Sequence, residues 1–198
     1  VLDTIERVMP EGGDHRFRIE HSQHLRPDDI ERFARLGVIA SIQTIHLSSD
    51  RPWAIDRLGP ERIDEGAYLW RSLIDSGVHV ANGTDVPVEP INPIANFYAA
   101  VTRKTLAGLP SEGFESDQRM TRAEALQSLT QWNAYAVFME DTLGSISVGK
   151  AADMTVLSQD IMTVDEGLLL DTEVTMTVIG GEIVYHAQAP MVTGVTDQ

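Results

Sequence analysis

The sequence predicts an α/β fold, with a parallel sheet built from strand–helix units and a small β module after it. Three observations lead to this prediction. Strand-like and helix-like segments alternate over residues 1–140, which is the order of a parallel sheet. After Asp141 the helical pattern gives way to short strands and turns. Hydrophobic residues make up 42% of 198 residues, enough for one or two domains with real cores.

The first strand and helix carry clear local signals. Residues 16–21 alternate polar and apolar side chains with a period of two, which is typical of a strand. The next helix is expected at 27–36, because Pro27 suits the first helical turn and Asp28 suits the positive end of the helix dipole. Gly37 is expected to end that helix in the left-handed conformation.

The remaining elements follow from the same patterns. In the first part we expect a helix end at 1–9, strands at 38–43 and 78–83, and helices at 52–58, 63–76, 93–104 and 122–140. The last of these helices has a capping box, Thr121 with Glu124. In the second part we expect strands at 154–157, 174–179 and 182–185, the last two joined at Gly180 and Gly181 as a hairpin.

Charge and composition exclude several classes of protein. The formal charge is −15, from 15 basic and 30 acidic residues, so a nucleic-acid partner is not expected. With no cysteine, the chain has no disulfide, no thiolate zinc site and no cysteine nucleophile. Neither a membrane span nor a signal peptide is visible, and we expect a cytoplasmic protein.

Three polar residues lie where parallel α/β folds place their chemistry, at the carboxyl ends of the strands. His21 ends the first predicted strand, His46 follows the second and Asp85 follows the third. Imidazole and carboxylate groups are good ligands for zinc or a related divalent ion. Spacing alone leaves the structural alternatives open, since each histidine could be a hydrogen-bonded structural residue and Asp85 could fix a turn.

The other histidines are weaker candidates. His15 and His79 lie six residues before His21 and Asp85, which at about 3.3 Å per strand residue places them at the opposite end of the sheet. His24 lies in a loop and stays open as a ligand, and His186 belongs to the β module.

Six segments, in order, resemble the amidohydrolase superfamily, in the branch of the N-substituted formamide deformylases (amidohydrolase family 3). They cover 16–186, nearly the whole chain, and read Arg18-Ile19-Glu20-His21-Ser22-Gln23, Gly37-Val38-Ile39-Ala40-Ser41-Ile42-Gln43 with His46 and Asp50, Ala67-Tyr68-Leu69-Trp70-Arg71-Ser72-Leu73, Gly83-Thr84-Asp85-Val86-Pro87-Val88-Glu89-Pro90, Gly144-Ser145-Ile146 with Gly149-Lys150-Ala151-Ala152-Asp153, and Val178-Ile179-Gly180-Gly181 with Val184-Tyr185.

The resemblance implies a partial (β/α)8 TIM-type barrel over 1–140, holding strands six to eight, and part of a small composite β-sandwich over 141–198. It implies a metal-dependent hydrolase of an amide or related C–N bond in a small-molecule substrate. His21 matches a metal ligand, and Asp85 matches both a ligand and the proton acceptor from the attacking water. His46 would bind substrate, and one or two divalent ions, zinc first among them, would be the cofactor.

The chain departs from the family pattern in two ways. Thr44 stands where proline is usual and Thr84 where serine is usual, both near the expected site. No H-x-H pair occurs, and no segment matches the ligands of the fourth and fifth strands. We therefore expect the C-terminal portion of an enzyme, which needs the missing N-terminal barrel half for a complete site and is close to inactive alone. The alternative is a non-catalytic α/β module that binds, or is completed by, another protein.

Overall fold

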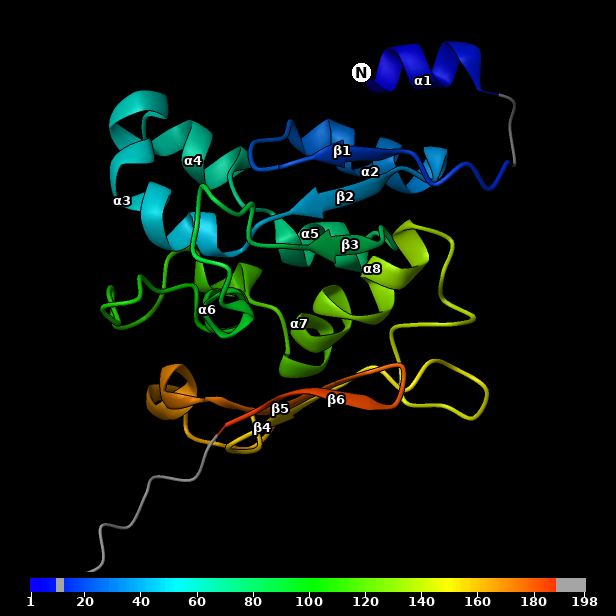
Figure 1. The fold of residues 1–198 in the computed structure, drawn as a ribbon. Coiled ribbons are helices and arrows are strands. Elements are labelled where there is room, and N and C mark those ends of the chain that lie inside the picture. The colour runs from blue at the N-terminus through cyan, green and yellow to red at the C-terminus, as the bar shows by residue number, and fades with distance from the viewer. Residues whose placement is uncertain (10–12, 188–198) are drawn as a thin grey trace, which may run out of the picture.

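Two separate sheets form the framework of the computed structural model, which describes residues 1–9 and 13–187 (Figure 1). The first sheet is parallel, in the order β1 (Arg18–Glu20), β2 (Ile39–Ile42) and β3 (Val80–Asn82). The second is antiparallel, in the order β4 (Met154–Leu157), β5 (Val174–Ile179) and β6 (Glu182–His186). The predicted parallel sheet and the predicted β module are both confirmed.

Helices connect the parallel strands and cover the sheet. The helices of the first part are α1 (Leu2–Val8), α2 (Pro27–Leu36), α3 (Ile45–Leu58), α4 (Pro60–Gly66), α5 (Trp70–Asp75), α6 (Pro93–Thr102), α7 (Arg122–Leu129) and α8 (Gln131–Ala136), with the 3₁₀ turn η1 (Ser116–Gln118). Local capping signals hold where they were expected. Gly37 ends α2 with φ 64°, and Thr121 and Glu124 form the reciprocal capping box of α7.

Three predicted helix boundaries are wrong. The helix expected at 63–76 is broken, because Tyr68 has φ 54° and its backbone N–H donates to the carbonyl of Gln23. The helix expected at 122–140 is interrupted at Thr130 and ends at Ala136. The helix expected at 52–58 begins at Ile45, and Pro52 lies inside it. The break at Tyr68 arises from a contact with another element, which no local pattern records.

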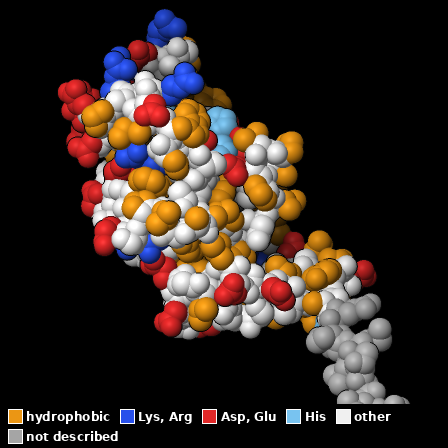
Figure 2. Space-filling model, turned by 90° about the vertical axis from the view of Figure 1, so that its left-hand side faces the viewer, with side chains coloured by type: hydrophobic (Ala, Val, Ile, Leu, Met, Phe, Trp, Pro, Cys, Tyr) orange, Lys and Arg blue, Asp and Glu red, His pale blue; other side chains and the backbone are white. Residues whose placement is uncertain are grey.

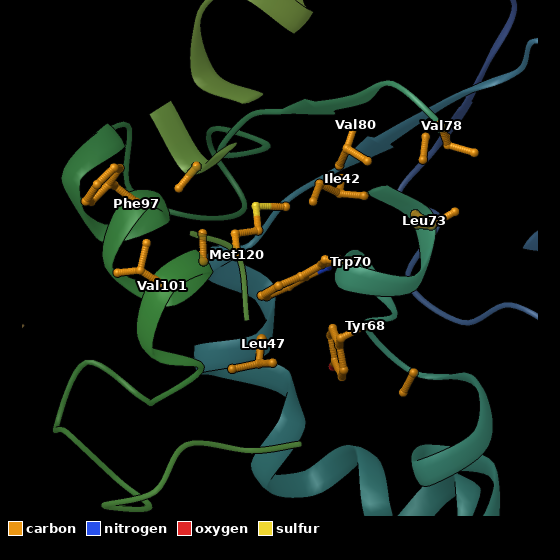
Figure 3. Packing of buried hydrophobic residues seen from close by; sticks show 14 of the residues in the cluster. Ile42, Leu47, Tyr68, Trp70, Leu73, Val78, Val80, Phe97, Val101 and Met120 are labelled. Atoms are coloured by element: carbon orange, nitrogen blue, oxygen red, sulfur yellow. The ribbon is translucent and has the colours of Figure 1, made fainter. Parts of the chain in front are cut away.

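The main core lies between the parallel sheet and its helices (Figure 3). Ile42 and Val80 of neighbouring strands belong to this cluster together with Trp70 and Leu73 of α5. Trp70 is 1% exposed, and its ring makes an edge-to-face contact with the ring of Tyr68. Burying each large apolar side chain contributes about 1.5–3 kcal/mol, so this cluster fixes how the strand ends are arranged.

The β4–β6 sheet packs beside the helices through η2 (Glu166–Asp171) (Figure 1). Both guanidinium Nη atoms of Arg122 donate to carbonyls in the segment before η2, those of Ile161 and Val164. The sheet has few buried side chains, and every residue of β6 is exposed. Of the expected second part, 141–198, residues 188–198 lie outside the described residues.

Within the part of the chain that the structure describes, no helix has the length and apolar character needed to cross a membrane.

Candidate metal centre

His21, His46 and Asp85 converge at the carboxyl edge of the parallel sheet. One ligand atom from each residue can be chosen so that all three lie within 4.8 Å of one another. His46 Nε2 is 3.7 Å from Asp85 Oδ2, and His21 Nδ1 is 4.0 Å from the same oxygen. The two imidazole rings are stacked, with centroids 5.9 Å apart. The structure therefore brings together the three residues that the strand ends predicted.

The site is open on one side. The His21 side chain is 54% exposed and that of Asp85 35%, whereas that of His46 is 8% exposed. Figure 2 shows histidine side chains at the surface next to an acidic group. A small molecule can therefore approach the first two groups from solvent, while His46 forms the inner wall.

The backbone at the site is held in unusual conformations. His21 has φ 67°, Ser22 has φ 39° and Asp85 has φ 58°, all in the left-handed region that non-glycine residues rarely adopt. The turn at His21 and Ser22 is stabilised by the buried side chain of Ser22, because its hydroxyl donates to the carbonyl of Ile19. Such strain is typical of functional sites, where the fold enforces a geometry that the local sequence disfavours.

Gln43 orients His21. The amide oxygen Oε1 of Gln43 accepts a hydrogen bond of 2.9 Å from His21 Nδ1, which leaves the lone pair of Nε2 free. Histidine ligands in metal sites are usually oriented by such a bond to their other ring nitrogen. Sequence reasoning did not assign a role to Gln43, although its place next to the β2 end was a usable signal.

The three residues fit a divalent metal ion. His46 Nε2 is buried and has no hydrogen-bond partner in the described ranges, 1–9 and 13–187. A buried nitrogen without a partner is costly, and a metal ion or a ligand atom would satisfy it. Imidazole and carboxylate groups are donors that zinc commonly takes, and a catalytic zinc site keeps one position open for water or substrate.

The other histidines of residues 1–140 lie outside this group. His15 Nε2 bonds to the carbonyl of Leu36, and the ring of His79 is stacked 4.0 Å from Tyr135. His24 lies edge-on to Tyr68. Burial lowers the pKa of both His24 and His79, which favours their neutral forms.

Comparison with known proteins gives the family. A model described as "Amidohydrolase family" matches residues 1–185. The chain belongs to the amidohydrolase family. The resemblance found in the six sequence segments is thereby confirmed.

Two relatives of this amidohydrolase chain show how much of a longer protein it covers. It is 37% identical to putative amidohydrolase YtcJ of Bacillus subtilis over 186 residues, which is 94% of this chain and 35% of the relative. It is 35% identical to the N-substituted formamide deformylase of Arthrobacter pascens, over 94% of this chain and 34% of that enzyme. The chain thus spans about a third of the length of these curated relatives.

Solved structures support the same family. An uncharacterized metal-dependent hydrolase from Pyrococcus horikoshii OT3 superposes with a TM-score of 0.69 at 31% identity, covering 84% of this amidohydrolase chain and 32% of that one. Atrazine chlorohydrolase TrzN from Arthrobacter aurescens TC1 gives a TM-score of 0.60 at 20% identity, covering 89% and 38%, and shows the shared fold alone.

Proposed function

We propose that this chain forms part of the active site of a metal-dependent hydrolase that cleaves an amide or related C–N bond. The observation that supports this most is the meeting of His21, His46 and Asp85 at one edge of the sheet, with a buried and unpaired nitrogen on His46. In the proposal, β1, β2 and β3 are the sixth to eighth strands of a (β/α)8 barrel. Residues outside the chain supply the rest of the barrel and its remaining ligands.

His21 and Asp85 would hold the metal ion. Zinc is the ion that the donor set favours, and the TrzN structure is described as complexed with zinc. A bound divalent ion would lower the pKa of its water to about 7. The hydrogen bond from His21 Nδ1 to Gln43 holds the ring in one orientation, and Nε2 keeps the free lone pair with which this ring would bind the ion.

Asp85 would act as the general base. Its Oδ2 atom faces both imidazoles, so the carboxylate lies where the attacking water would be held. The carboxylate takes a proton from that water and then delivers it to the leaving nitrogen. A carboxylate that both accepts and returns the proton completes the hydrolysis without a second titrating residue.

His46 would bind the substrate. Its Nε2–H is at the inner wall of the site and can donate a hydrogen bond to the carbonyl oxygen of the scissile amide. Such a donor stabilises the negative charge that develops on that oxygen during attack. The similarity to putative amidohydrolase YtcJ and to the A. pascens N-substituted formamide deformylase supports an amide-type substrate.

A zinc titration tests the proposal. The product of the complete reading frame that encodes these residues is titrated with zinc chloride by calorimetry, as the wild type and as Asp85→Asn. Asp56→Asn is the control, because Asp56 is an exposed carboxylate on α3. We expect wild-type binding, weakening of more than about tenfold in Asp85→Asn, and no change in Asp56→Asn. Equal binding by Asp85→Asn and the wild type would contradict the metal site.

A hydrolysis assay tests the partial barrel. N-substituted formamides are offered to the 198-residue chain and to the complete reading frame that encodes it. We expect hydrolysis by the complete product, lowered in its Asp85→Asn variant, and little or none by the 198 residues alone. Tight stoichiometric zinc together with robust hydrolysis by the 198-residue chain would show that no further ligands are needed.

A further inference from the structure

The first turn of α3 is capped from two other elements. A helix leaves its first backbone N–H groups without partners inside the helix. In α3, Thr44 N donates to Asn82 Oδ1 at 3.2 Å, and Ile45 N donates to Asn96 Oδ1 at 2.9 Å. Asn82 is the last residue of β3 and Asn96 lies in α6, so the start of this helix is determined by its neighbours.

Asn82 connects β3 to this turn through its whole amide group. Its side chain is buried, with 3% of the residue exposed. The Nδ2 atom donates to Thr44 Oγ1 at 3.0 Å and to Ser128 Oγ at 3.3 Å. Thr44 Oγ1 in turn donates to the carbonyl of Asn96 at 2.7 Å. Since the amide oxygen and nitrogen both have partners, a change at Asn82 breaks the link on both sides.

Asn133 of α8 holds Asn82 in place. The backbone N–H of Asn82 donates to Asn133 Oδ1 at 3.0 Å, and Asn133 Nδ2 donates to the Asn82 carbonyl at 2.9 Å. These two bonds take the place of those that a neighbouring strand would make at the outer edge of β3. The end of β3 is therefore fixed from both sides, by Thr44 and by Asn133.

The link between Asn82 and Thr44 is close in the chain to two residues of the candidate metal centre. Only Gly83 and Thr84 separate Asn82 from Asp85, and only Ile45 separates Thr44 from His46. We propose that Asn82 is a positioning residue, which sets the separation between His46 and Asp85 by tying the start of α3 to the end of β3. The proposal rests on the metal site of the proposed function.

If the Asn82 cap served folding alone, weakening it would lower the stability of the protein. The zinc affinity of the folded protein would then stay unchanged. Gln118 of η1 provides the matched comparison, because its Oε1 accepts from Ser72 N at 3.1 Å and from Ser72 Oγ at 3.2 Å. Gln118 is also a side-chain amide that binds a helical backbone N–H, but its bonds join η1 to α5, away from the site.

The test measures zinc affinity by calorimetry and stability by urea unfolding on the product of the complete reading frame that encodes these 198 residues. The variants are Asn82→Ala and Asn133→Ala, with Gln118→Ala as the control. Loss of residues that support a metal ligand typically weakens binding by 10- to 100-fold. We expect at least about tenfold weaker zinc binding in Asn82→Ala, a smaller loss in Asn133→Ala, and a loss of stability without a change in affinity in Gln118→Ala.

A double-mutant comparison separates this proposal from the proposed function. If Asn82 acts through Asp85, adding Asn82→Ala to Asp85→Asn weakens zinc binding little further, because the effects of coupled residues are not additive. Loss of zinc in Asp85→Asn with equal affinities in Asn82→Ala and Gln118→Ala would overturn the positioning role alone. Absence of zinc binding by the wild type would overturn both.

Thr44→Val is the milder variant, for use if Asn82→Ala does not fold. It removes the hydroxyl that bonds to Asn82 Nδ2 and the Asn96 carbonyl, while keeping the Thr44 N–H that donates to Asn82 Oδ1. We expect zinc binding weakened several-fold in this variant. Unchanged affinity in folded Thr44→Val and Asn133→Ala would also overturn the positioning role.

Discussion

The Nε2 atom of His46 lies 3.7 Å from the carboxylate oxygen Oδ2 of Asp85, and it has no hydrogen-bond partner among the described residues. A purely structural histidine would normally bond to a carbonyl, as His15 does with Leu36. An unsatisfied buried polar atom costs about 1–3 kcal/mol. The fold therefore keeps the Nε2 atom of His46 at the site although this lowers stability. Such a cost is expected where a ligand completes the contact.

Replacing His46 by phenylalanine separates function from stability. His46→Phe keeps the ring but removes the unpaired nitrogen, so we expect the free energy of unfolding to stay the same or to rise by about 1–3 kcal/mol. Hydrolysis by the protein that the complete reading frame encodes should fall, because the donor to the substrate carbonyl is lost. Urea unfolding of the 198-residue chain and turnover of the complete product measure the two effects.

His79→Phe is the control for that change. His79 is an exposed residue whose ring is stacked on Tyr135. It precedes β3, away from the carboxyl edge of the sheet, so its replacement should leave turnover unchanged. If His46→Phe instead loses more than about 2 kcal/mol of stability and keeps its turnover, His46 is a structural residue.

Gln43 should matter through His21. Gln43→Met keeps the length and most of the volume of the side chain but removes the oxygen that accepts the His21 Nδ1–H. The imidazole is then free to rotate, and we expect zinc affinity to fall by about 10- to 100-fold, with the melting temperature little changed. Gln159→Met, which removes bonds to Leu168 and Thr172 in the β module, is the comparison and should not alter zinc binding.

Much of the fold and the site followed from local sequence. The boundaries of β4 and β5 and the caps at Gly37 and Thr121 match, because alternation, glycine and capping boxes act over a few residues. The convergence of His21, His46 and Asp85 also followed, since it needs only the rule that parallel strands end on the same edge.

The rest depends on partners that are remote in sequence. Tyr68 adopts φ 54° where the pattern favours a continuous helix, and its carbonyl accepts from Arg103 Nη1. Asn82 and Asn96 decide where α3 begins, and neither is near α3 in the chain. Gln43 directly follows β2, but only the position of His21 beside it gives it a role. Such long-range bonds leave no periodic signal.

Arg103 should be a major determinant of stability. It is fully buried, lies 4.6 Å from the Trp70 ring, and donates to the carbonyls of Tyr68 and Phe114 and to Glu115. Burial lowers its pKa to about 10.

Because Arg103→Met would leave those acceptors unpaired, we expect a loss of about 3–5 kcal/mol in urea unfolding. Arg57→Met, an exposed change on α3, should stay within about 0.5 kcal/mol of the wild type. A loss below about 1 kcal/mol for Arg103→Met would mean that its bonds are replaced by water or by repacking.

The ion pair of Arg16 with Glu140 should make stability depend on pH. Both guanidinium Nη atoms donate to the Glu140 carboxylate, at 2.6 and 2.7 Å, and this lowers the pKa of Glu140 to about 2. An unfolded glutamate has a pKa of about 4.3, so the stabilisation is complete above that pH and is lost as the pH falls towards about 2. Glu140→Gln should therefore be less stable than the wild type at pH 6, with the difference narrowing at pH 3. Glu61→Gln, an exposed change on α4, is the control. If urea unfolding shows the same difference in stability between Glu140→Gln and the wild type at pH 6 and at pH 3, the assignment is contradicted.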